Sequence, residues 1–341
     1  MNVELLKKLA LSFGPSGYEK ETAEVVMEEL TSLGIPVTRD SCGGVIGKIG
    51  CGEEKIMLIA TLDEASFMVT DVDGDGFVRM EALTSVDCRT VPGKRMTIGG
   101  DMEKVDAVSA VKVLHLRGGS ERDEVSMDKI FLNMGCKNKE EAEKLTKKGE
   151  FATFSGNFRT LGEDYLCCKA LDGRSSCALL LEEAKRLVES PDEGRTYILV
   201  FAVKGLAGLS SAPFTAFREQ PLRAVLVDSC GANDIYDTEK EKDKQANVSL
   251  GKGAMLPLYD GQVLYYDSPE YQVLVASAEG AGIAFQQGKG CGNAGAVHLT
   301  GSGIPMVSVS LPCRNPRSEG VIIHKNDYES ALELLHLAAI L

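Results

Sequence analysis

Apolar and polar positions follow two different periods at the start of the chain. Residues 16–34 carry apolar side chains at helical spacing, and Ser16 and Glu19 have the spacing of a capping box. Two strands follow, and the second of them, residues 56–60, is apolar without interruption. Such a run is typical of a strand that is buried on both faces of a sheet. This stretch therefore predicts the start of an α/β domain.

The pattern changes in the next part of the chain. Residues 68–83 alternate around an Asp-Gly turn, which indicates a β-hairpin. Short strands separated by turns follow, and residues 138–150 predict a charged helix. We therefore predict a small, mainly β domain over residues 68–162, inserted into a larger α/β domain that is formed by residues 1–67 and 163–341.

Helices and buried strands then alternate to the end of the chain. Residues 174–190 predict an amphipathic helix, and residues 196–203 and 222–229 predict buried strands. Residues 325–341 predict a closing helix. The predicted fold class is α/β, with a central sheet that is covered by helices.

Composition narrows the possible partners. The chain has 341 residues and a net charge of −13, which argues against nucleic acid or an anionic membrane as a partner. No stretch has the pattern of a signal peptide or is long and apolar enough to span a bilayer, so we expect a cytoplasmic protein. The ten cysteines include no CxxC pair, which argues against a cysteine-rich metal site.

Polar residues stand directly after several predicted strands or before a helix. Asp63, Lys204 and Asp228 follow buried strands, and Asp172 precedes the helix at 174–190. Arg317 lies in the segment after the last strand. Each Asp alone is explained equally well as a helix cap or a turn residue. Their shared placement favours one site at the edge of the sheet.

Several segments resemble the cytosolic dinuclear-metal aminopeptidases, the family of tetrahedral aminopeptidase, glutamyl aminopeptidase and the proteins once labelled cellulase M. The segment IATLDEASFMV is similar to a family segment of the form A-A-H-M-D-E-I-G-F-M-V. KALDGRSS and NAGAVHLTGSGIPMVSVSLPCR continue in register. The resemblance covers nearly the whole chain. It implies a zinc-aminopeptidase-like central sheet covered by helices, and an inserted domain through which subunits dimerise.

The resemblance also implies a chemistry. Family members hold two divalent metals, usually zinc or cobalt, which one Asp bridges. A His and an Asp complete one metal site, a Glu and a His complete the other, and a neighbouring Glu acts as general base. The two cations polarise the substrate carbonyl and acidify a shared water, whose proton the Glu accepts.

Three carboxylates of that arrangement are retained here. By the resemblance, Asp172 stands at the bridging position, Asp228 at the second Asp ligand, and Asp63 at the Asp that orients the first His. Two monodentate carboxylates do not make a good coordination site for zinc, which takes three protein ligands even at an open catalytic site. Occupancy by metal at Asp172 and Asp228 is therefore doubtful.

The other roles fall on residues of different chemistry. Thr61 replaces the first His, and Lys204 and Gly205 replace the general base and the neighbouring Glu ligand. Arg317 replaces the last His, and Asn293 stands where the family commonly has Asp. We interpret Thr61, Asp63, Lys204, Gly205, Asn293 and Arg317 as a vestigial pocket.

Two of these replacements, Lys204 and Arg317, are positively charged and could neutralise the retained aspartates. We expect Lys204 or Arg317 to form an ion pair with Asp172 or Asp228, since buried carboxylates need a charged partner or become protonated. The same two cations could instead bind an anion such as a carboxylate or a phosphate.

Three functions therefore stay open. The sequence favours a catalytically inactive family member that needs no cofactor and acts as a binding or structural protein for a peptide or a small anionic ligand. The second is a hydrolase with one weakly bound zinc or cobalt ion or an altered mechanism. The third is an anion-binding protein that uses Lys204 and Arg317. In each case we expect a homo-oligomer, at least a dimer through the inserted domain.

No other histidine or cysteine completes a metal or nucleophile site in this interpretation. We expect structural roles for His298, His324 and His336, and His115 lies in the inserted domain. Two cysteines near the matched motifs, Cys230 and Cys291, have no neighbouring His that would activate them.

Overall fold

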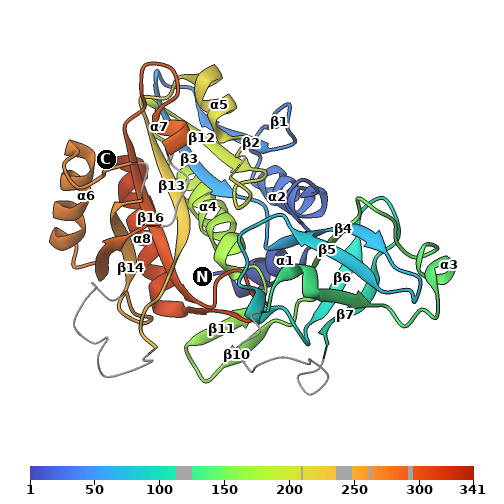
Figure 1. Cartoon of the computed structure of the whole chain (residues 1–341). Helices are drawn as coiled ribbons and strands as arrows, with labels where there is room; N and C mark the ends of the chain where they lie inside the picture. Colours follow the sequence, from blue (N-terminus) through green and yellow to red (C-terminus); the bar gives the residue numbers. More distant parts are fainter. Residues whose placement is uncertain (113–124, 209, 236–247, 261–262, 291–294) are drawn as a thin grey trace.

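The computed structural model describes the chain except for residues 113–124, 209, 236–247, 261–262 and 291–294 (Figure 1). The described residues form an eleven-stranded mixed sheet and a separate, closed barrel of six strands. The barrel lies beside the helix-covered main sheet (Figure 1). This arrangement confirms the predicted fold class, an α/β domain with a small β unit.

The core of the main sheet consists of strands that are buried on both faces. The order of the strands runs β1 (Val37–Arg39), β2 (Val45–Gly50), β12 (Arg195–Ala202), β3 (Glu54–Thr61), β13 (Arg223–Gly231), β16 (Met306–Arg314), β17 (Val321–His324), β11 (Tyr165–Cys168) and β10 (Arg159–Leu161). Off this path, β14 (Ala254–Tyr259) pairs with β16, and β15 (Phe285–Lys289) pairs with β14. The strands β12, β3, β13 and β16 are parallel neighbours. Their carboxyl ends therefore meet at one edge.

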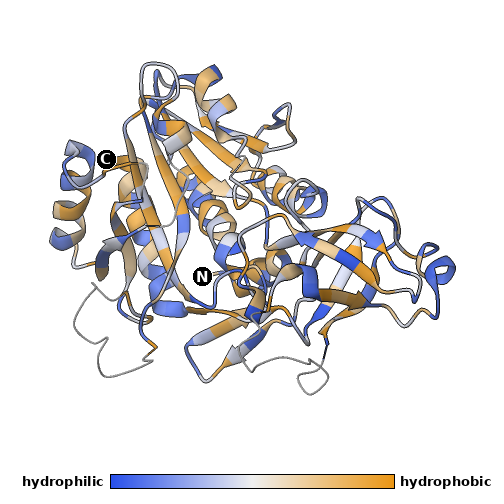
Figure 2. Ribbon diagram, viewed as in Figure 1, coloured by the Kyte–Doolittle hydropathy of each residue, from blue (hydrophilic) through white to orange (hydrophobic). Residues whose placement is uncertain are grey.

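Helices cover this sheet. They are α1 (Val3–Leu11), α2 (Lys20–Ser32), α4 (Leu171–Glu189), α5 (Ala212–Glu219), α6 (Pro269–Gly280), α7 (Gly295–His298) and α8 (Lys325–Ile340). The most buried is α4, which packs against β3, β13, α1 and α8. Figure 2 shows hydrophobic residues along the strands of the main sheet, as continuous apolar runs predict. No helix in the described ranges is both long enough and apolar enough to cross a membrane.

The barrel has its own apolar core. Its strands are β4 (Ser66–Val72), β5 (Val78–Ala82), β6 (Arg95–Gly99), β7 (Val105–Val111), β8 (Ile130–Asn133) and β9 (Phe151–Phe154). Phe67 and Phe154 pack edge to face inside it, 5.7 Å between ring centroids. The charged helix predicted at 138–150 is only one turn, α3 (Lys139–Ala142), so that prediction was wrong in length. The division of the chain at residues 68 and 162 stays a proposal.

The helix predicted within residues 16–34 is the second helix of the chain, after α1, and it begins differently from the prediction. The helix α2 starts at Lys20, and the Glu19 side chain makes no capping bond to it. Ser16 Oγ instead donates to Asp63 Oδ2 at 2.6 Å, and Glu19 Oε1 accepts from the N–H groups of Gly17 and Lys204, both at 2.8 Å. The predicted capping box was therefore wrong, because both side chains bind residues of the strand-end loops.

Candidate active-site cavity

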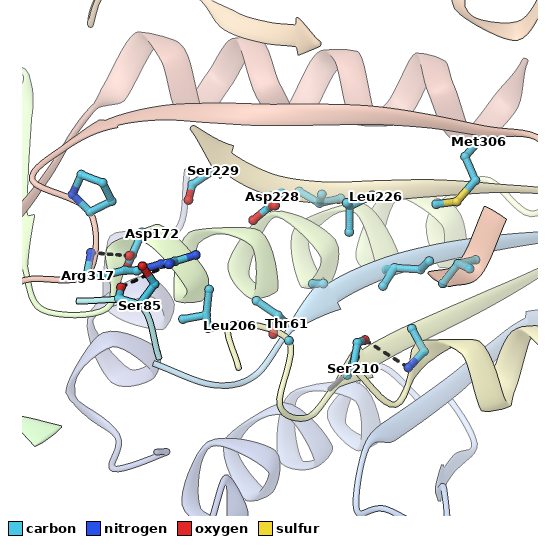
Figure 3. A pocket seen from close by; sticks show the side chains of 18 of the residues that line it. Thr61, Ser85, Asp172, Leu206, Ser210, Leu226, Asp228, Ser229, Met306 and Arg317 are labelled. Atoms are coloured by element: carbon cyan, nitrogen blue, oxygen red, sulfur yellow. Dashed lines mark hydrogen bonds between the residues drawn. The ribbon is translucent and has the colours of Figure 1, made fainter. Parts of the chain in front are cut away.

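The carboxyl ends of the parallel strands surround a cavity of about 350 Å³ (Figure 3). Its lining comes from β3, β12, β13 and β16, from the loops that follow them, from the helices α4, α5 and α7, and from a loop of the barrel. The lining side chains that carry polar or charged groups are Thr61, Ser85, Asp172, Ser210, Asp228, Ser229 and Arg317. Five of the positions predicted to form one site, Thr61, Gly205, Asp172, Asp228 and Arg317, therefore line one cavity.

Asp172 lies in the first turn of α4 and is held by one main-chain bond. The helix starts after Ala170, which has a left-handed φ of 60°. Asp172 Oδ2 accepts from the Arg317 N–H at 2.6 Å, whereas Asp172 Oδ1 is buried and has no hydrogen-bond partner within the described part of the chain. Burial raises the pKa of Asp172, and the Arg317 N–H and charge oppose that rise. This carboxylate is thus only half satisfied by the protein.

Asp228 faces the same cavity from β13 (Figure 3). Burial raises its pKa to about 7. The N–H of Ser229 and the charge of Arg317 oppose that rise, while the charges of Asp172 and Asp260 add to it. The cavity therefore disfavours a second ionised carboxylate next to Asp172.

Asp63 is fully buried behind Thr61 and has a complete set of donors. Thr61 Oγ1 donates to Asp63 Oδ1 at 2.5 Å, and Ser16 Oγ donates to Oδ2 at 2.6 Å. The N–H of Leu206 donates to both oxygens, at 3.2 and 2.9 Å. These bonds fix the end of β3 against the loop after β12, so Asp63 organises the loops around the cavity.

Thr61 and Gly205 are sterically linked. A Cβ atom at position 205 would overlap Thr61 Oγ1 and would lie 2.9 Å from Thr61 Cβ. Separations below about 3 Å are not found for real Cβ atoms, so one of the two groups would have to move. The threonine side chain at position 61 can therefore take its observed position only because residue 205 has no Cβ atom.

Lys204 is not among the residues that line the cavity. It has a left-handed φ of 59°, and its N–H donates to Glu19 Oε1 at 2.8 Å. Its Cε lies 3.9 Å from the place where a Cβ on Gly17 would be, so the side chain extends over the Gly17 turn. Burial raises the pKa of Glu19, and the hydrogen bond that Glu19 accepts from the Gly17 N–H opposes this rise.

Arg317 meets Asp172 in a different way from the predicted ion pair. Its main-chain N–H binds Asp172, while guanidinium Nη1 donates to the carbonyl oxygen of Ser85 at 3.2 Å. No ion pair within 4.0 Å joins Arg317 or Lys204 to Asp172 or Asp228, all of which are described residues. The predicted ion pair was therefore wrong, because a φ of 59° at Arg317 turns its N–H group, and not its guanidinium, onto the carboxylate.

The remaining candidates do not complete the site. His298 Nδ1 bonds the Ile304 carbonyl at 2.9 Å, His324 caps α8, and His336 Nδ1 lies 2.9 Å from Glu183 Oε1. Cys230 is buried and is not among the residues that line the cavity, although Ser229 and Gly231 are. Asn293, Cys291 and His115 lie outside the described residues, so the predictions for them stay predictions.

A buried charge network supports the start of α4 beneath the cavity. Lys169 Nζ lies 2.7 and 2.6 Å from the two oxygens of Glu64, and Arg174 Nη2 lies 3.3 Å from Glu64 Oε1. Burial lowers the pKa of Lys169, and the negative charge of Glu64 opposes this decrease. The network ties α4 to the end of β3, so it positions Asp172 without facing the cavity itself.

The family model of the M42 glutamyl aminopeptidases matches residues 43–334. The chain belongs to this family. It is 31% identical to a protein of Acetivibrio thermocellus that is provisionally named an aminopeptidase, over 97% of this chain and 96% of that protein. These comparisons confirm the predicted family resemblance.

Solved structures of the same kind share the fold. A TET aminopeptidase from a Thaumarchaeota archaeon of marine sediment has a TM-score of 0.92 at 24% identity, and covers 99% of this chain and 95% of that chain. The TET1 peptidase of Pyrococcus horikoshii has a TM-score of 0.86 at 27% identity, over 99% and 98%. That second protein can assemble into a tetrahedron or a large octahedral shell.

The residues of this M42 family member do not fit a dinuclear metal centre. Asp172 and Asp228 are the carboxylates on the cavity lining, while a threonine, a glycine and an arginine occupy the other ligand positions implied by the resemblance. Within the described ranges, no group of three or more His, Cys, Asp or Glu side chains is placed to hold a metal. A zinc site needs at least three protein ligands.

Sequence reasoning missed several residues that shape the cavity. Ser85 comes from the barrel, and Leu206 and Met306 supply apolar walls. Ser16 and Glu19 stood out in the sequence, but their spacing indicated a helix cap. Only the three-dimensional meeting of the barrel loop with Arg317 identifies Ser85, because the two residues are 232 positions apart.

Proposed function

We propose that this chain is a cytoplasmic member of the M42 family that does not hydrolyse peptides and uses its cavity to bind a ligand. The observation that carries the proposal is the donor set of the cavity, where two aspartates are the remaining metal-ligand residues. Two monodentate carboxylates do not hold a pair of zinc or cobalt ions in a catalytic geometry. The fold is kept, but the groups that would activate water are not.

The residue at the general-base position supports the same proposal. Lys204 carries an ammonium group, which has no lone pair to accept a proton from water. Its side chain extends over the Gly17 turn instead of lining the cavity. Removal of a general base alone lowers rates by roughly 100- to 10,000-fold. The loss of the metals adds to that effect, because nothing then lowers the pKa of the attacking water.

An activity assay tests this proposal. Leucyl, glutamyl and lysyl reporter substrates are incubated with the purified chain, with and without added zinc or cobalt, and the lysyl aminopeptidase of Pyrococcus furiosus serves as the active reference. We expect rates at background. Any residual rate should be the same in the Asp172→Asn variant. An unchanged rate would show that a contaminating enzyme produces it. Metal-stimulated cleavage that Asp172→Asn abolishes would contradict the proposal and favour a hydrolase with an altered metal site.

We also propose that the chain forms a homo-oligomer, at least a dimer through the inserted barrel domain. The assembly of the similar Pyrococcus horikoshii peptidase into closed shells supports this proposal. Light scattering on the purified chain gives the molar mass directly. A mass of one subunit at all protein concentrations would contradict it.

A further inference from the structure

The charges on the cavity lining do not balance. Asp172 and Asp228 face the cavity, and Arg317 supplies the positive charge among the lining residues that the structure describes. Its guanidinium donates to the Ser85 carbonyl and lies beyond 4.0 Å of either carboxylate. With both carboxylates ionised, these three side chains carry one net negative charge, and a bound monovalent cation would stabilise that state. A buried charge without a partner costs several kcal/mol, so the cavity is electrostatically suited to a monovalent cation.

One carboxylate oxygen lacks a donor. Asp172 is 3% exposed, and its Oδ1 atom has no hydrogen-bond partner among the residues that the structure describes. The other oxygen, Oδ2, already accepts from Arg317. Buried carboxylate oxygens are nearly always hydrogen-bonded, so Oδ1 points to a donor that the protein does not supply. An ammonium group offers three N–H donors and a positive charge in one compact group.

The rest of the cavity lining is mainly apolar. Its apolar residues include Ile59, Ala212, Leu226, Val297 and Met306. In Figure 3, Leu226 and Met306 lie on one side of Asp228, and Asp172 and Arg317 lie on the other. The cavity thus has a charged end and an apolar end, which is the usual composition of a small-molecule site.

We propose that this cavity binds a small organic ammonium ion with an apolar tail. The ammonium group lies between Asp172 Oδ1 and Asp228, and the tail lies along Leu226 and Met306. The inference rests on the proposed function, because bound metal ions would occupy both carboxylates. An anion is disfavoured by the same two carboxylates, so anion binding becomes an outcome of the test.

The test needs no variant. Hexylamine is charged at neutral pH, since alkylamines have a pKa near that of lysine, about 10.4. Calorimetry on the full chain in a chelating buffer compares hexylammonium with hexanol and hexanoate. We expect hexylammonium to bind at least about tenfold more tightly than either, as a charged hydrogen bond implies. Equal binding of hexanol, tighter binding of hexanoate, or no binding of hexylammonium would each overturn the inference.

Chain length and charge variants test the two ends of the cavity. Propylammonium should bind more weakly than hexylammonium by roughly fourfold for each methylene removed. Asp172→Asn and Asp228→Asn should each weaken hexylammonium by about tenfold, whereas Asp75→Asn removes the same charge from an exposed turn of the barrel and should have no effect. An equal effect of all three variants, or affinity independent of chain length, would overturn the inference.

The two proposals fail in different ways. A metal-free, inactive chain that does not bind hexylammonium contradicts only this inference. A chain that takes up two metals and hydrolyses reporter substrates contradicts the proposed function as well.

Discussion

At the scale of single residues, Asp228 is a partly buried carboxylate at the end of β13 that faces the cavity. Burial raises its pKa to about 7 from an ordinary value of 3.8. The folded chain therefore binds this proton more tightly than the unfolded chain does. The contribution of this group to the free energy of unfolding is fully present below about pH 4 and is lost as the pH rises to about 7.

Replacing Asp228 by Asn should stabilise the ligand-free protein at pH 8. The variant removes the group that must ionise in a buried place, so its gain in free energy of unfolding should reach roughly 1 to 3 kcal/mol there and shrink toward pH 5. Urea denaturation at both pH values measures the difference. Asp75→Asn is the control, and an Asp228→Asn variant that loses stability equally at both pH values would contradict the account.

At Arg317, in contrast, the main chain matters more than the charge of the side chain. Its φ of 59° lies in the left-handed region, and its N–H holds Asp172. Arg317→Gly keeps that N–H and suits the φ, so we expect a change within about 1 kcal/mol. Arg317→Pro removes the donor and cannot adopt the φ, and should cost more than about 2 kcal/mol. Denaturant titration separates the two, and a large loss in the glycine variant would point to the guanidinium instead.

At the scale of elements, the ends of β3 and β12 are built as a matched pair. Thr61 and Ala202 are register partners, and Gly205 follows in the loop where any Cβ would overlap Thr61. The small residue at 205 and the threonine at 61 therefore depend on each other. Restoring a ligand side chain at position 205 alone would push the two strand ends apart.

Gly205→Ala should therefore destabilise the chain by about 1 to 3 kcal/mol. The double variant with Thr61→Gly should recover most of that loss, so a double-mutant cycle should give a coupling of about 1 kcal/mol or more. Gly280→Ala is the matched control, since nothing lies within 4 Å of a Cβ there. Additive effects of the Thr61 and Gly205 changes in thermal or denaturant unfolding would show that the two positions are independent.

At the scale of the whole molecule, the sequence predicted those elements whose burial produces a regular pattern of apolar residues. The apolar run at 56–60 was predictable because both faces of β3 are covered, and the helix at 174–190 was predictable from its amphipathic period. The helix begins earlier than predicted, at Leu171, so Asp172 lies inside its first turn and not before it. The placement of Asp172 and Asp228 in one cavity was predictable from the family positions that they occupy. What could not be predicted were contacts between distant segments, such as Arg317 with Ser85, and the direction of a long side chain such as that of Lys204.

Charge placement was the least predictable feature. Opposite charges at neighbouring family positions suggested ion pairs. Because Arg317 has a left-handed φ, its main-chain N–H contacts Asp172 where a guanidinium contact was expected. Backbone conformation of this kind has no signature in a sequence when the residue is Arg, because left-handed positions usually carry Gly or Asn. The result is a cavity with unbalanced carboxylates, which underlies both proposals.

Metal stoichiometry tests the central claim most directly. The purified chain is incubated with excess zinc or cobalt, desalted and analysed by mass spectrometry of the elements, with the Pyrococcus furiosus lysyl aminopeptidase treated in parallel. The account predicts no tightly bound metal in this chain, because Asp172 and Asp228 alone do not make a zinc site. Two tightly retained ions per chain, lost in Asp172→Asn, would contradict it.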